Sequence, residues 1–389
     1  MEQRKKIAAI NTVYFPNSHA DVIVTKYMAG YPTDEGHRAP RVELTSIYLD
    51  QIEARDIGVG LAEEHKVPIY ASIRQALTRG ESDLTVDGVL LIGEHGEYPH
   101  NEFGQHMYPR KYMFEQICGV FASSGRSVPV FCDKHLSYNW EDAYWMYLRA
   151  KELNIPFMAG SSLPLCWRQP FLEHSLDTPL ESAISIGYGG VESYGFHALE
   201  TLQCMIERRQ GGESGVVAVQ CIEGDAVWNA AASGEWSLEL AEAACAKIKN
   251  RPESSIVEGC PNPILFLIEH RDGFRSAVLM LNGYVTDFAY AGKIGNEINA
   301  TEFYLQNEVP YAHFSYLSLN IEEMFVTGVP QYPVERTLLT TGVLDAIMHS
   351  RAQNYTRLET PHLAEIAYQS YQKTPIRPTA PRPEGATLE

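Results

Sequence analysis

Three ionisable side chains, Asp133, Lys134 and His135, follow closely after the apolar run at residues 128–131. The valines and the phenylalanine of that run favour a buried strand. In an open parallel sheet, ligands bind at the carboxyl ends of the strands, and a carboxylate, an amine and an imidazole placed there are suited to acid/base chemistry. The simpler interpretation is a solvated loop, so the rest of the chain has to decide between the two.

The connection after the apolar run at residues 86–92 is longer than the usual length of about 2–6 residues. It carries six glutamate and histidine side chains, at Glu94, His95, Glu97, His100, Glu102 and His106. Such side chains are suited to Zn, Mn or Fe. Glu94 and His95, directly after the strand, are predicted to bind a metal ion together with Asp133 and His197 if one is present. For the other four, a solvated surface is the better interpretation.

A third group of polar residues lies at residues 187–200. Its adjacent glycines, Gly189 and Gly190, indicate a turn that approaches another group closely. The helix that follows carries His197 and Glu200 one turn apart on the same face. A buried structural histidine and a functional one are equally compatible with this pattern.

The turn after the first predicted strand lacks the glycines that bind a dinucleotide. In Rossmann domains these glycines let the diphosphate reach the helix N-terminus, whereas residues 11–19 contain none. Tyr14 and Phe15 would fill the space that the phosphates need, and Pro16 removes a backbone donor. Asp50, at the end of the second strand, is the one candidate for binding a cofactor ribose. The sequence therefore argues against NAD(P) binding.

Short apolar strands alternate with helices in the first part of the chain, which predicts a Rossmann-like, doubly wound parallel sheet in residues 1–163. The strands are expected at residues 7–13, 42–50, 67–70, 86–92, 128–131 and 155–160. Residues 164–350 are predicted to form an α+β domain with a largely antiparallel open sheet, because three strand patterns between residues 264 and 291 follow one another directly. Residues 351–389 are predicted to form a C-terminal extension, and its last ~25 residues are expected to wrap a neighbour or stay loose.

The composition limits the class of partner. The net charge of −18 argues against nucleic acid or an anionic membrane surface. No stretch reaches the ~20 apolar residues that a membrane span requires, and seven cysteines without CxxC spacing indicate buried free thiols in a reducing compartment. These features predict a cytoplasmic protein whose partner is a small-molecule substrate.

With its elements in this order, the chain resembles the Gfo/Idh/MocA oxidoreductases, in which a Rossmann domain precedes an α+β domain whose sheet mediates oligomerisation. The resemblance rests on residues 132–135, 160–168 and 189–200. The first stretch stands where the family has Glu-Lys-Pro, and the last is similar to the family's glycine-rich helix start with its histidine. The resemblance implies a homo-oligomer formed through the strands between residues 264 and 291.

The resemblance also implies roles for single residues. Lys134 matches the lysine that contacts substrate and cofactor, and His197 matches the catalytic histidine. Arg168, next to Trp167, matches an arginine on the substrate side. Ser193, however, stands where the family has a catalytic aspartate. Together with the missing nucleotide glycines, this change points away from ordinary hydride transfer and towards proton transfer.

The leading hypothesis is an enzyme that acts on a sugar-like or polyhydroxylated small molecule by acid/base chemistry, assisted by a divalent transition metal if one binds, without ordinary NAD turnover. A lyase, hydratase, isomerase or hydrolase would fit. The predicted catalytic residues are Lys134, His197 and His135, and the predicted substrate-binding residues are Arg168, Asp133, Glu192 and Trp167. Two alternatives stay open: an NAD(P)-dependent oxidoreductase of a sugar or polyol with an atypical phosphate turn, and a non-catalytic sugar-binding or assembly protein.

Overall fold

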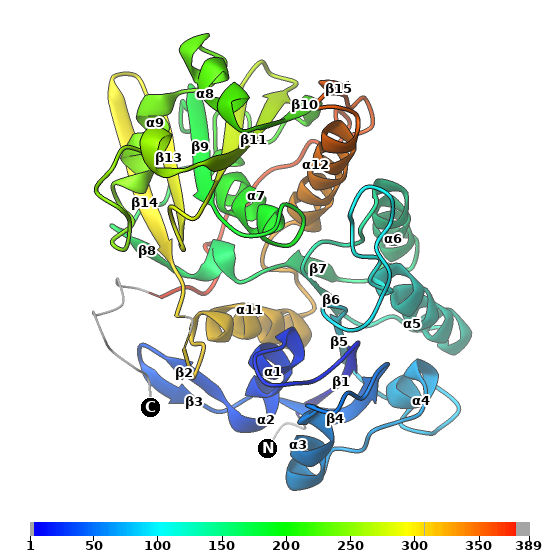
Figure 1. The fold of residues 1–389 in the computed structure, drawn as a ribbon. Coiled ribbons are helices and arrows are strands. Elements are labelled where there is room, and N and C mark those ends of the chain that lie inside the picture. The colour runs from blue at the N-terminus through cyan, green and yellow to red at the C-terminus, as the bar shows by residue number, and fades with distance from the viewer. Residues whose placement is uncertain (1–3, 307, 379–389) are drawn as a thin grey trace.

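The computed structural model describes residues 4–306 and 308–378, and the first of its sheets is parallel, as predicted (Figure 1). Apolar runs of β-branched residues form the buried strands. Each crossover returns the chain to the end of the sheet at which the previous strand began, so that the strands run parallel. In spatial order, the five strands are β4 (Val42–Leu49), β1 (Lys5–Asn11), β5 (Gly88–Ile92), β6 (Val130–Asp133) and β7 (Phe157–Gly160).

The strand expected at residues 67–70 is reduced to a single parallel bridge between Ile47 and Ile69 at the outer edge of β4. Pro68 has no N–H to donate, and Ile69 is 36% exposed, so the segment contributes little to a ladder. With this bridge counted, the spatial order is that of a Rossmann sheet. The order reverses between β1 and β5, where ligands bind in such sheets.

Helices cover both faces of the first sheet. The helical segment after β1 is divided at Thr25, and Ser18 caps its first part by accepting a hydrogen bond from the Asp21 N–H. A small hairpin of β2 (Tyr31–Thr33) and β3 (Gly36–Arg38) follows, which the sequence did not indicate. The helices are α1 (His19–Val24), α2 (Lys26–Ala29), α3 (Gly58–His65), α4 (Ile73–Thr78), α5 (Arg110–Ser124) and α6 (Trp140–Glu152).

The second sheet has eight strands and is antiparallel except where β9 pairs with β12, which confirms the predicted fold class. The short helix η1 (Leu163–Leu165) leads into it. In spatial order its strands are β15 (Leu358–Glu359), β10 (Val216–Glu223), β11 (Asn262–His270), β12 (Arg275–Asn282), β9 (Ser182–Gly187), β13 (Phe288–Ile294), β14 (Glu297–Tyr304) and β8 (Trp167–Gln169).

Both faces of this sheet are covered by helices of the same chain. Along β12, Val278 and Met280 pack in the cluster that contains α7 (Ser193–Ile206) and α12 (Val334–Ala352). The alternate residues Ala277 and Leu279 pack in a separate cluster. That cluster contains α8 (Asp225–Ala232), α9 (Leu238–Cys245) and α10 (Ile256–Gly259). Both faces of the strands expected to mediate oligomerisation are therefore packed against helices of the same chain, and a homo-oligomer stays a prediction.

The chain returns to the first domain after its second sheet. Helix α11 (His313–Thr327) lies beside α1 in Figure 1, and its Leu317 and Phe325 belong to the same buried cluster as Ile7. Phe325 approaches β5 at Gly88, where a Cβ would lie 2.6 Å from its ring. Residues after 163 thus contribute to the Rossmann-like unit, unlike in the simple two-part division expected from the sequence.

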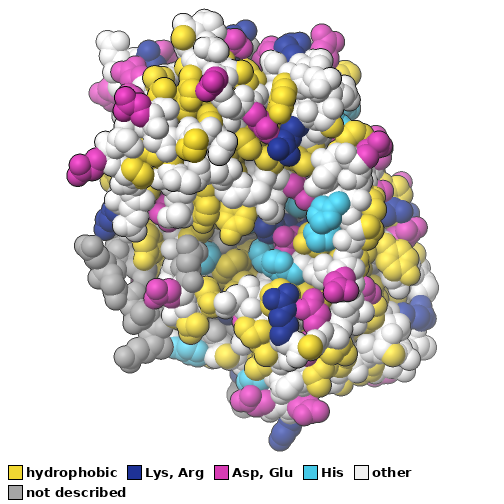
Figure 2. Space-filling model, viewed as in Figure 1, with side chains coloured by type: hydrophobic (Ala, Val, Ile, Leu, Met, Phe, Trp, Pro, Cys, Tyr) yellow, Lys and Arg dark blue, Asp and Glu magenta, His cyan; other side chains and the backbone are white. Residues whose placement is uncertain are grey.

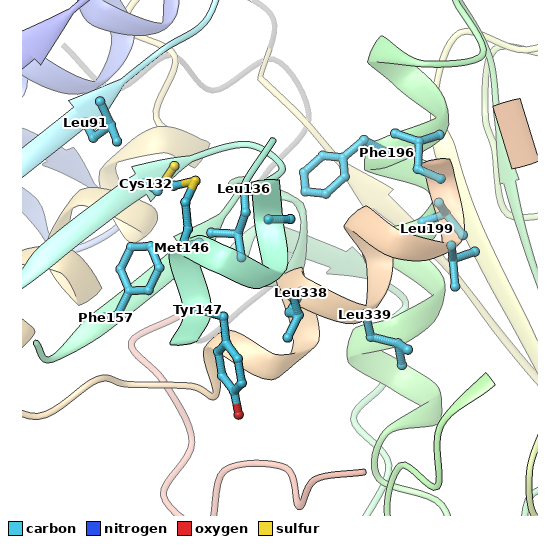
Figure 3. Close-up of a cluster of buried hydrophobic side chains, with 14 of the residues drawn as sticks. Leu91, Cys132, Leu136, Met146, Tyr147, Phe157, Phe196, Leu199, Leu338 and Leu339 are labelled. Atoms are coloured by element: carbon cyan, nitrogen blue, oxygen red, sulfur yellow. The ribbon is translucent and has the colours of Figure 1, made fainter. Parts of the chain in front are cut away.

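A continuous core joins the two domains. Figure 3 shows Leu136 and Phe157 from the first domain with Phe196, Leu199 and Leu338 from the helices of the second. Because these side chains are buried in one cluster, the elements that carry them are held in a fixed relation. The carboxyl end of β6 and the start of α7 therefore face each other across a rigid junction.

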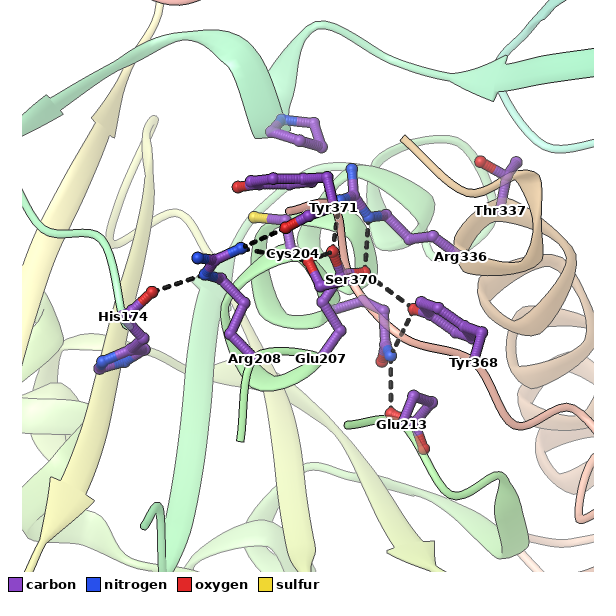
Figure 4. Close-up of polar contacts among 12 residues, drawn as sticks. His174, Cys204, Glu207, Arg208, Glu213, Arg336, Thr337, Tyr368, Ser370 and Tyr371 are labelled. Carbon is purple, nitrogen blue, oxygen red and sulfur yellow. Dashed lines mark hydrogen bonds and ion pairs between the residues drawn. The ribbon is translucent and has the colours of Figure 1, made fainter. Parts of the chain in front are cut away.

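The described part of the C-terminal extension packs on its own chain. Figure 4 shows Tyr368 and Ser370 donating hydrogen bonds to the buried carboxylate of Glu207, at 2.9 and 2.7 Å. Further along, the N–H of Ile376 donates to the side chain of Asn320 at 2.9 Å. The expectation of a loose or neighbour-wrapping tail is wrong for residues up to 378, and the rest of the predicted extension lies outside the described residues.

The seven cysteines are all buried and unpaired, as predicted. Burial raises the pKa of thiols such as Cys132 and Cys221 to about 12, so they stay protonated at neutral pH. Within residues 4–306 and 308–378, none of the helices is both long and apolar enough to cross a membrane.

Candidate active site

A cavity of about 640 Å³ lies between the two domains, at the carboxyl ends of β1, β5 and β6. Figure 2 shows histidine side chains gathered in this region. Seven of the 13 histidines of the chain line the cavity, which makes it the main concentration of imidazoles in the protein. They are His19, His95, His100, His106, His135, His197 and His313.

Lys134 and His197 meet at one wall of the cavity. Lys134 follows β6 with a φ of +66°, and its Nζ lies 2.7 Å from Nε2 of His197 on α7. Burial and the neighbouring ammonium hold the pKa of His197 well below its usual value. The imidazole is therefore neutral at pH 7, with Nε2 accepting a hydrogen bond from the ammonium group.

The other nitrogen of His197 continues the chain of hydrogen bonds inwards. Its Nδ1 donates to Ser161 Oγ at 3.1 Å, and the Ser161 hydroxyl donates to the buried carboxyl of Glu200. Gly160, at φ +116°, leaves room for that carboxyl, because a Cβ there would lie 2.3 Å from Glu200 Oε1. These hydrogen bonds form a continuous chain from Lys134 through His197 and Ser161 to Glu200, along which protons can move.

Burial raises the pKa of Glu200 to about 7, so replacing it by glutamine is expected to change the pH dependence of stability. A raised carboxyl pKa in the folded state means that wild-type stability decreases as pH rises from about 4.5 to 7. Glu200→Gln removes this loss, and the variant should gain on the order of 3 kcal/mol over wild type between pH 5 and pH 8. Urea unfolding at both pH values measures it, with the exposed Glu239→Gln as control. An equal difference at both pH values would contradict the assignment.

Glu94, at the end of β5, is held by two cations. Arg110 on α5 donates to it, and Lys134 Nζ lies 3.5 Å from its other oxygen. Although burial opposes ionisation, the charges of Lys134 and Arg110 hold the pKa of Glu94 well below its usual value. Gly93 lets the Arg110 side chain pass, since a Cβ there would lie 2.5 Å from Arg110 Cγ. Glu94 is thus a fixed anion that orients Lys134.

The four predicted metal ligands do not come together as a metal site. Glu94 pairs with Arg110 and Lys134, His197 accepts from Lys134, and Asp133 binds the imidazole of His19. In the part of the chain that the structure describes, no group of three or more His, Cys, Asp or Glu side chains is arranged to hold a metal ion. The side chains that the sequence suggested as metal ligands form ion pairs and hydrogen bonds with other residues instead.

His135 and Glu192 line the cavity next to each other. His135 Nε2 is 3.2 Å from Arg110 Nη1 and 3.9 Å from Glu192 Oε1, and burial keeps the pKa of this imidazole well below its usual value. Both Glu192 oxygens accept from the His106 N–H, at 3.0 and 2.9 Å. Burial raises the pKa of Glu192 to about 7. Glu192 therefore ties the long loop after β5 to the start of α7.

Arg168 and Trp167 were expected on the substrate side, but neither lines the cavity. Arg168 is 3% exposed, pairs with Glu173 and donates to the carbonyl of Leu172 at 2.9 Å. Trp167 is buried and donates to Asp34 at 2.9 Å. Both side chains are therefore used inside the fold, where β8 joins the edge of the second sheet.

The turn between β1 and α1 is filled by its own side chains. Tyr14 is 1% exposed and contacts Gly58 so closely that a Cβ there would lie 2.7 Å away. The ring of Phe15 lies under the Arg55 guanidinium at 3.6 Å and 5.4 Å from the ring of His95. Tyr14 is therefore packed in the core of the first domain, and Phe15 packs against Arg55 and His95.

The backbone donors of the same turn are also used within the chain. The N–H of Phe15 donates to Ser18 Oγ at 3.1 Å, and the N–H of Asn17 donates to the Asp21 carboxylate at 2.9 Å. At the end of β4, the Asp50 carboxylate accepts hydrogen bonds from the hydroxyls of Tyr48 and Tyr98, at 2.8 and 2.7 Å. The predicted ribose ligand is thus engaged by two tyrosines.

Comparisons with known proteins support the fold. No protein-family model and no curated protein matches the sequence. Among solved structures, GenD2 from gentamicin A biosynthesis in complex with NAD has a TM-score of 0.58 at 14% identity, covering 92% of this chain and 97% of that one. The scyllo-inositol dehydrogenase of Lactobacillus casei with NAD(H) and scyllo-inositol gives 0.54 at 11%, covering 92% and 99%. The myo-inositol dehydrogenase of Corynebacterium glutamicum gives 0.53 at 12%, with the same coverage.

These matches confirm the resemblance to Gfo/Idh/MocA oxidoreductases at the level of the fold. A dinucleotide in the place that a Rossmann domain gives it does not fit the residues present here. The N–H groups of Phe15 and Asn17 are already bound within the chain, and the Asp21 carboxylate beside them would repel phosphate. The fold is therefore shared with enzymes that bind NAD, while the phosphate-binding turn is not.

Several residues of the site were not found from the sequence. His19, Ser161 and Arg110 lie on three different elements and come together only through the fold. His19 had one signal, because it opens the first helix after β1, at the edge of the sheet where ligands bind. Arg110 had none, since no pattern connects it with Glu94.

Proposed function

We propose that this protein is an enzyme that transfers protons on a sugar-like or polyol substrate bound between its domains. The observation that carries the proposal is the contact of 2.7 Å between Lys134 Nζ and His197 Nε2 at the wall of the cavity. An ammonium group held by a neutral imidazole can give a proton to a substrate oxygen, and the resulting amine can take a proton back from the substrate in a later step. Lys134 acts as the acid, and His197 orients it through the lone pair of Nε2.

The chemistry of the cavity supports a small polar substrate. Its walls combine ionisable groups with aromatic rings, among them Tyr188, Tyr194 and Phe288. Aromatic faces pack against the C–H face of a sugar ring, while Glu192 and Lys134 can hydrogen-bond to hydroxyls. A carbonyl oxygen beside the Lys134 ammonium would be polarised, which favours removal of a proton from the neighbouring carbon.

A second candidate function is the NAD(P)-dependent oxidation of a sugar or polyol. The comparisons favour this candidate over chemistry without NAD, because two of the similar structures are named as inositol dehydrogenases and one of these holds NAD(H) with scyllo-inositol. The filled turn between β1 and α1 favours chemistry without NAD. Lys134 and His197 would take part in proton transfer in either case. The two candidates differ in whether NAD(P) also accepts a hydride from the substrate.

Thermal unfolding with and without ligands separates the candidates. We expect no change of Tm with 1 mM NAD+ or NADP+, because the N–H groups of Phe15 and Asn17 are bound within the chain and the Asp21 carboxylate would repel phosphate. We expect a rise with at least one member of a panel of inositols, hexoses and their keto derivatives. A ligand present at 100 times its Kd stabilises the folded state by about 2.7 kcal/mol. A saturable shift with a dinucleotide would favour the oxidoreductase. No shift with any panel member would count against both.

A further inference from the structure

We propose that His19, held in place by Asp133, is a second acid/base group of the cavity and acts as the base towards a C–H proton of the substrate. This inference rests on the proposed function and specifies it. His19 is the first residue of α1, and its Nδ1 lies 2.6 Å from Asp133 Oδ2. Nothing in the sequence brings these residues together, since they are 114 positions apart.

The carboxylate determines which nitrogen of His19 can act. An ionised carboxylate only accepts hydrogen bonds, so Nδ1 must carry the proton that it donates to Asp133. In the neutral imidazole, Nε2 then keeps its lone pair, and His19 lines the cavity. A buried carboxylate that orients an imidazole in this way is the arrangement by which serine hydrolases prepare a histidine as base. Asp133 is a positioning residue in this scheme.

The burial of Asp133 is hard to explain by stability alone. Its side chain is fully buried, and its Oδ1 has no hydrogen-bond partner among the described residues. Leaving a charged carboxylate oxygen unpartnered costs about 1–3 kcal/mol or more, and a buried ion pair gives little net stability in return. The pair with His19 is therefore better explained by a functional demand on the imidazole.

Two consecutive residues, Asp133 and Lys134, determine where the acid/base groups His19 and Lys134 lie. Asp133 ends β6 with its side chain directed to α1, whereas Lys134 turns through its positive φ towards α7. His19 and Lys134 both line the cavity as a result. His95 and Phe314 hold the His19 ring edge-on, at centroid distances of 5.5 and 5.7 Å.

This placement fits isomerisation or dehydration of a keto-polyol. His19 Nε2 takes the proton from the carbon beside the carbonyl, the electrons of that C–H bond form the C=C bond of an enol, and the carbonyl oxygen takes a proton from the Lys134 ammonium. In isomerisation, the imidazolium of His19 returns its proton to the other carbon while the Lys134 amine takes one from the adjacent hydroxyl. In dehydration, the imidazolium protonates a hydroxyl that leaves as water, and the Lys134 amine takes back the enol proton. Neither reaction needs an oxidant or a reductant.

The test is deuterium exchange at the carbon next to the carbonyl, followed by NMR in D2O with a panel of keto-inositols and keto-hexoses. We expect His19→Gln to lower exchange by about 10²–10⁴-fold, the usual contribution of a general base, with an unchanged Tm. His65→Gln, exposed at the end of α3, is the control for loss of an imidazole. Exchange within threefold of wild type in His19→Gln, while Lys134→Ala is inactive, would overturn the inference alone. No exchange by wild type with any panel member would overturn the proposed function as well.

A second measurement does not depend on turnover or on the stability of a variant. Long-range ¹H–¹⁵N NMR of histidine-labelled wild type reports which ring nitrogen carries the proton, with His19→Gln assigning the signal. We expect a protonated Nδ1 for His19, and Asp133→Asn should change this pattern and lower exchange together. A His19 protonated at Nε2 alone in wild type would overturn the inference, since that nitrogen could not act as a base.

Discussion

Replacing Lys134 by alanine is expected to lower turnover by about 10²–10⁴-fold, the range that general acid catalysis contributes. The ammonium group lies 2.7 Å from His197 Nε2 and 3.5 Å from Glu94, so its loss removes the proton donor and leaves the buried Glu94 with Arg110 alone. Turnover of the keto-polyol identified by deuterium exchange, measured as kcat and KM separately, gives the effect. The fall should be mainly in kcat, because the proton is transferred in the transition state.

Two further variants at lysine positions make this result specific. Lys134→Arg keeps the positive charge, but a guanidinium does not release its proton near neutral pH, so we expect it to be nearly as inactive as the alanine variant. Lys247→Ala, at an exposed position after α9, should keep full activity. Substantial turnover by Lys134→Arg would mean that the charge of Lys134 matters and its proton does not.

The largest effect on stability is expected from Arg336→Met in α12. Arg336 is 1% exposed and makes two hydrogen bonds to the buried carboxylate of Glu207, at 2.8 and 2.5 Å (Figure 4). Removing one partner of a buried ion pair costs about 3–5 kcal/mol, because the other charge stays buried and uncompensated. Urea unfolding of the variant should show this loss.

An exposed ion pair supplies the control for Arg336. Arg357 also makes two hydrogen bonds to a carboxylate, that of Glu269, but the side chains are 44% and 33% exposed. Exposed pairs contribute about 0–1 kcal/mol, so Arg357→Met should unfold almost as wild type does. A similar small loss in both variants would mean that the network around Glu207 does not hold the C-terminal segment in place.

The parts of the fold that the sequence predicted are those fixed by local patterns. The apolar strand patterns indicated β4, β5 and β7 close to their observed positions. The bridge at Ile69 was predicted as a full strand, because the edge position and Pro68 act only in the assembled sheet. The return of α11 to the first domain was missed, since it depends on the fit of Phe325 against Gly88.

The site shows the same division between local and long-range information. Lys134 was indicated by its position at a strand end, His197 was assigned by the family resemblance, and the fold brings the two into contact. Arg168 was assigned to the substrate side by resemblance, but it pairs with Glu173, a contact that no spacing reveals. The partner of Asp133 was unknown for the same reason, because His19 is distant in sequence.

Deuterium exchange by wild-type protein without any nucleotide tests the central claim most directly. The claim is that proton transfer at the Lys134–His197 pair proceeds without a dinucleotide, because N–H groups of the turn after β1 are bound within the chain. In D2O, with a panel of keto-inositols and keto-hexoses, the expected result is exchange at the carbon next to the carbonyl at the same rate with and without NAD(P)+. Exchange or turnover that begins only when NAD(P)+ is added would contradict the claim.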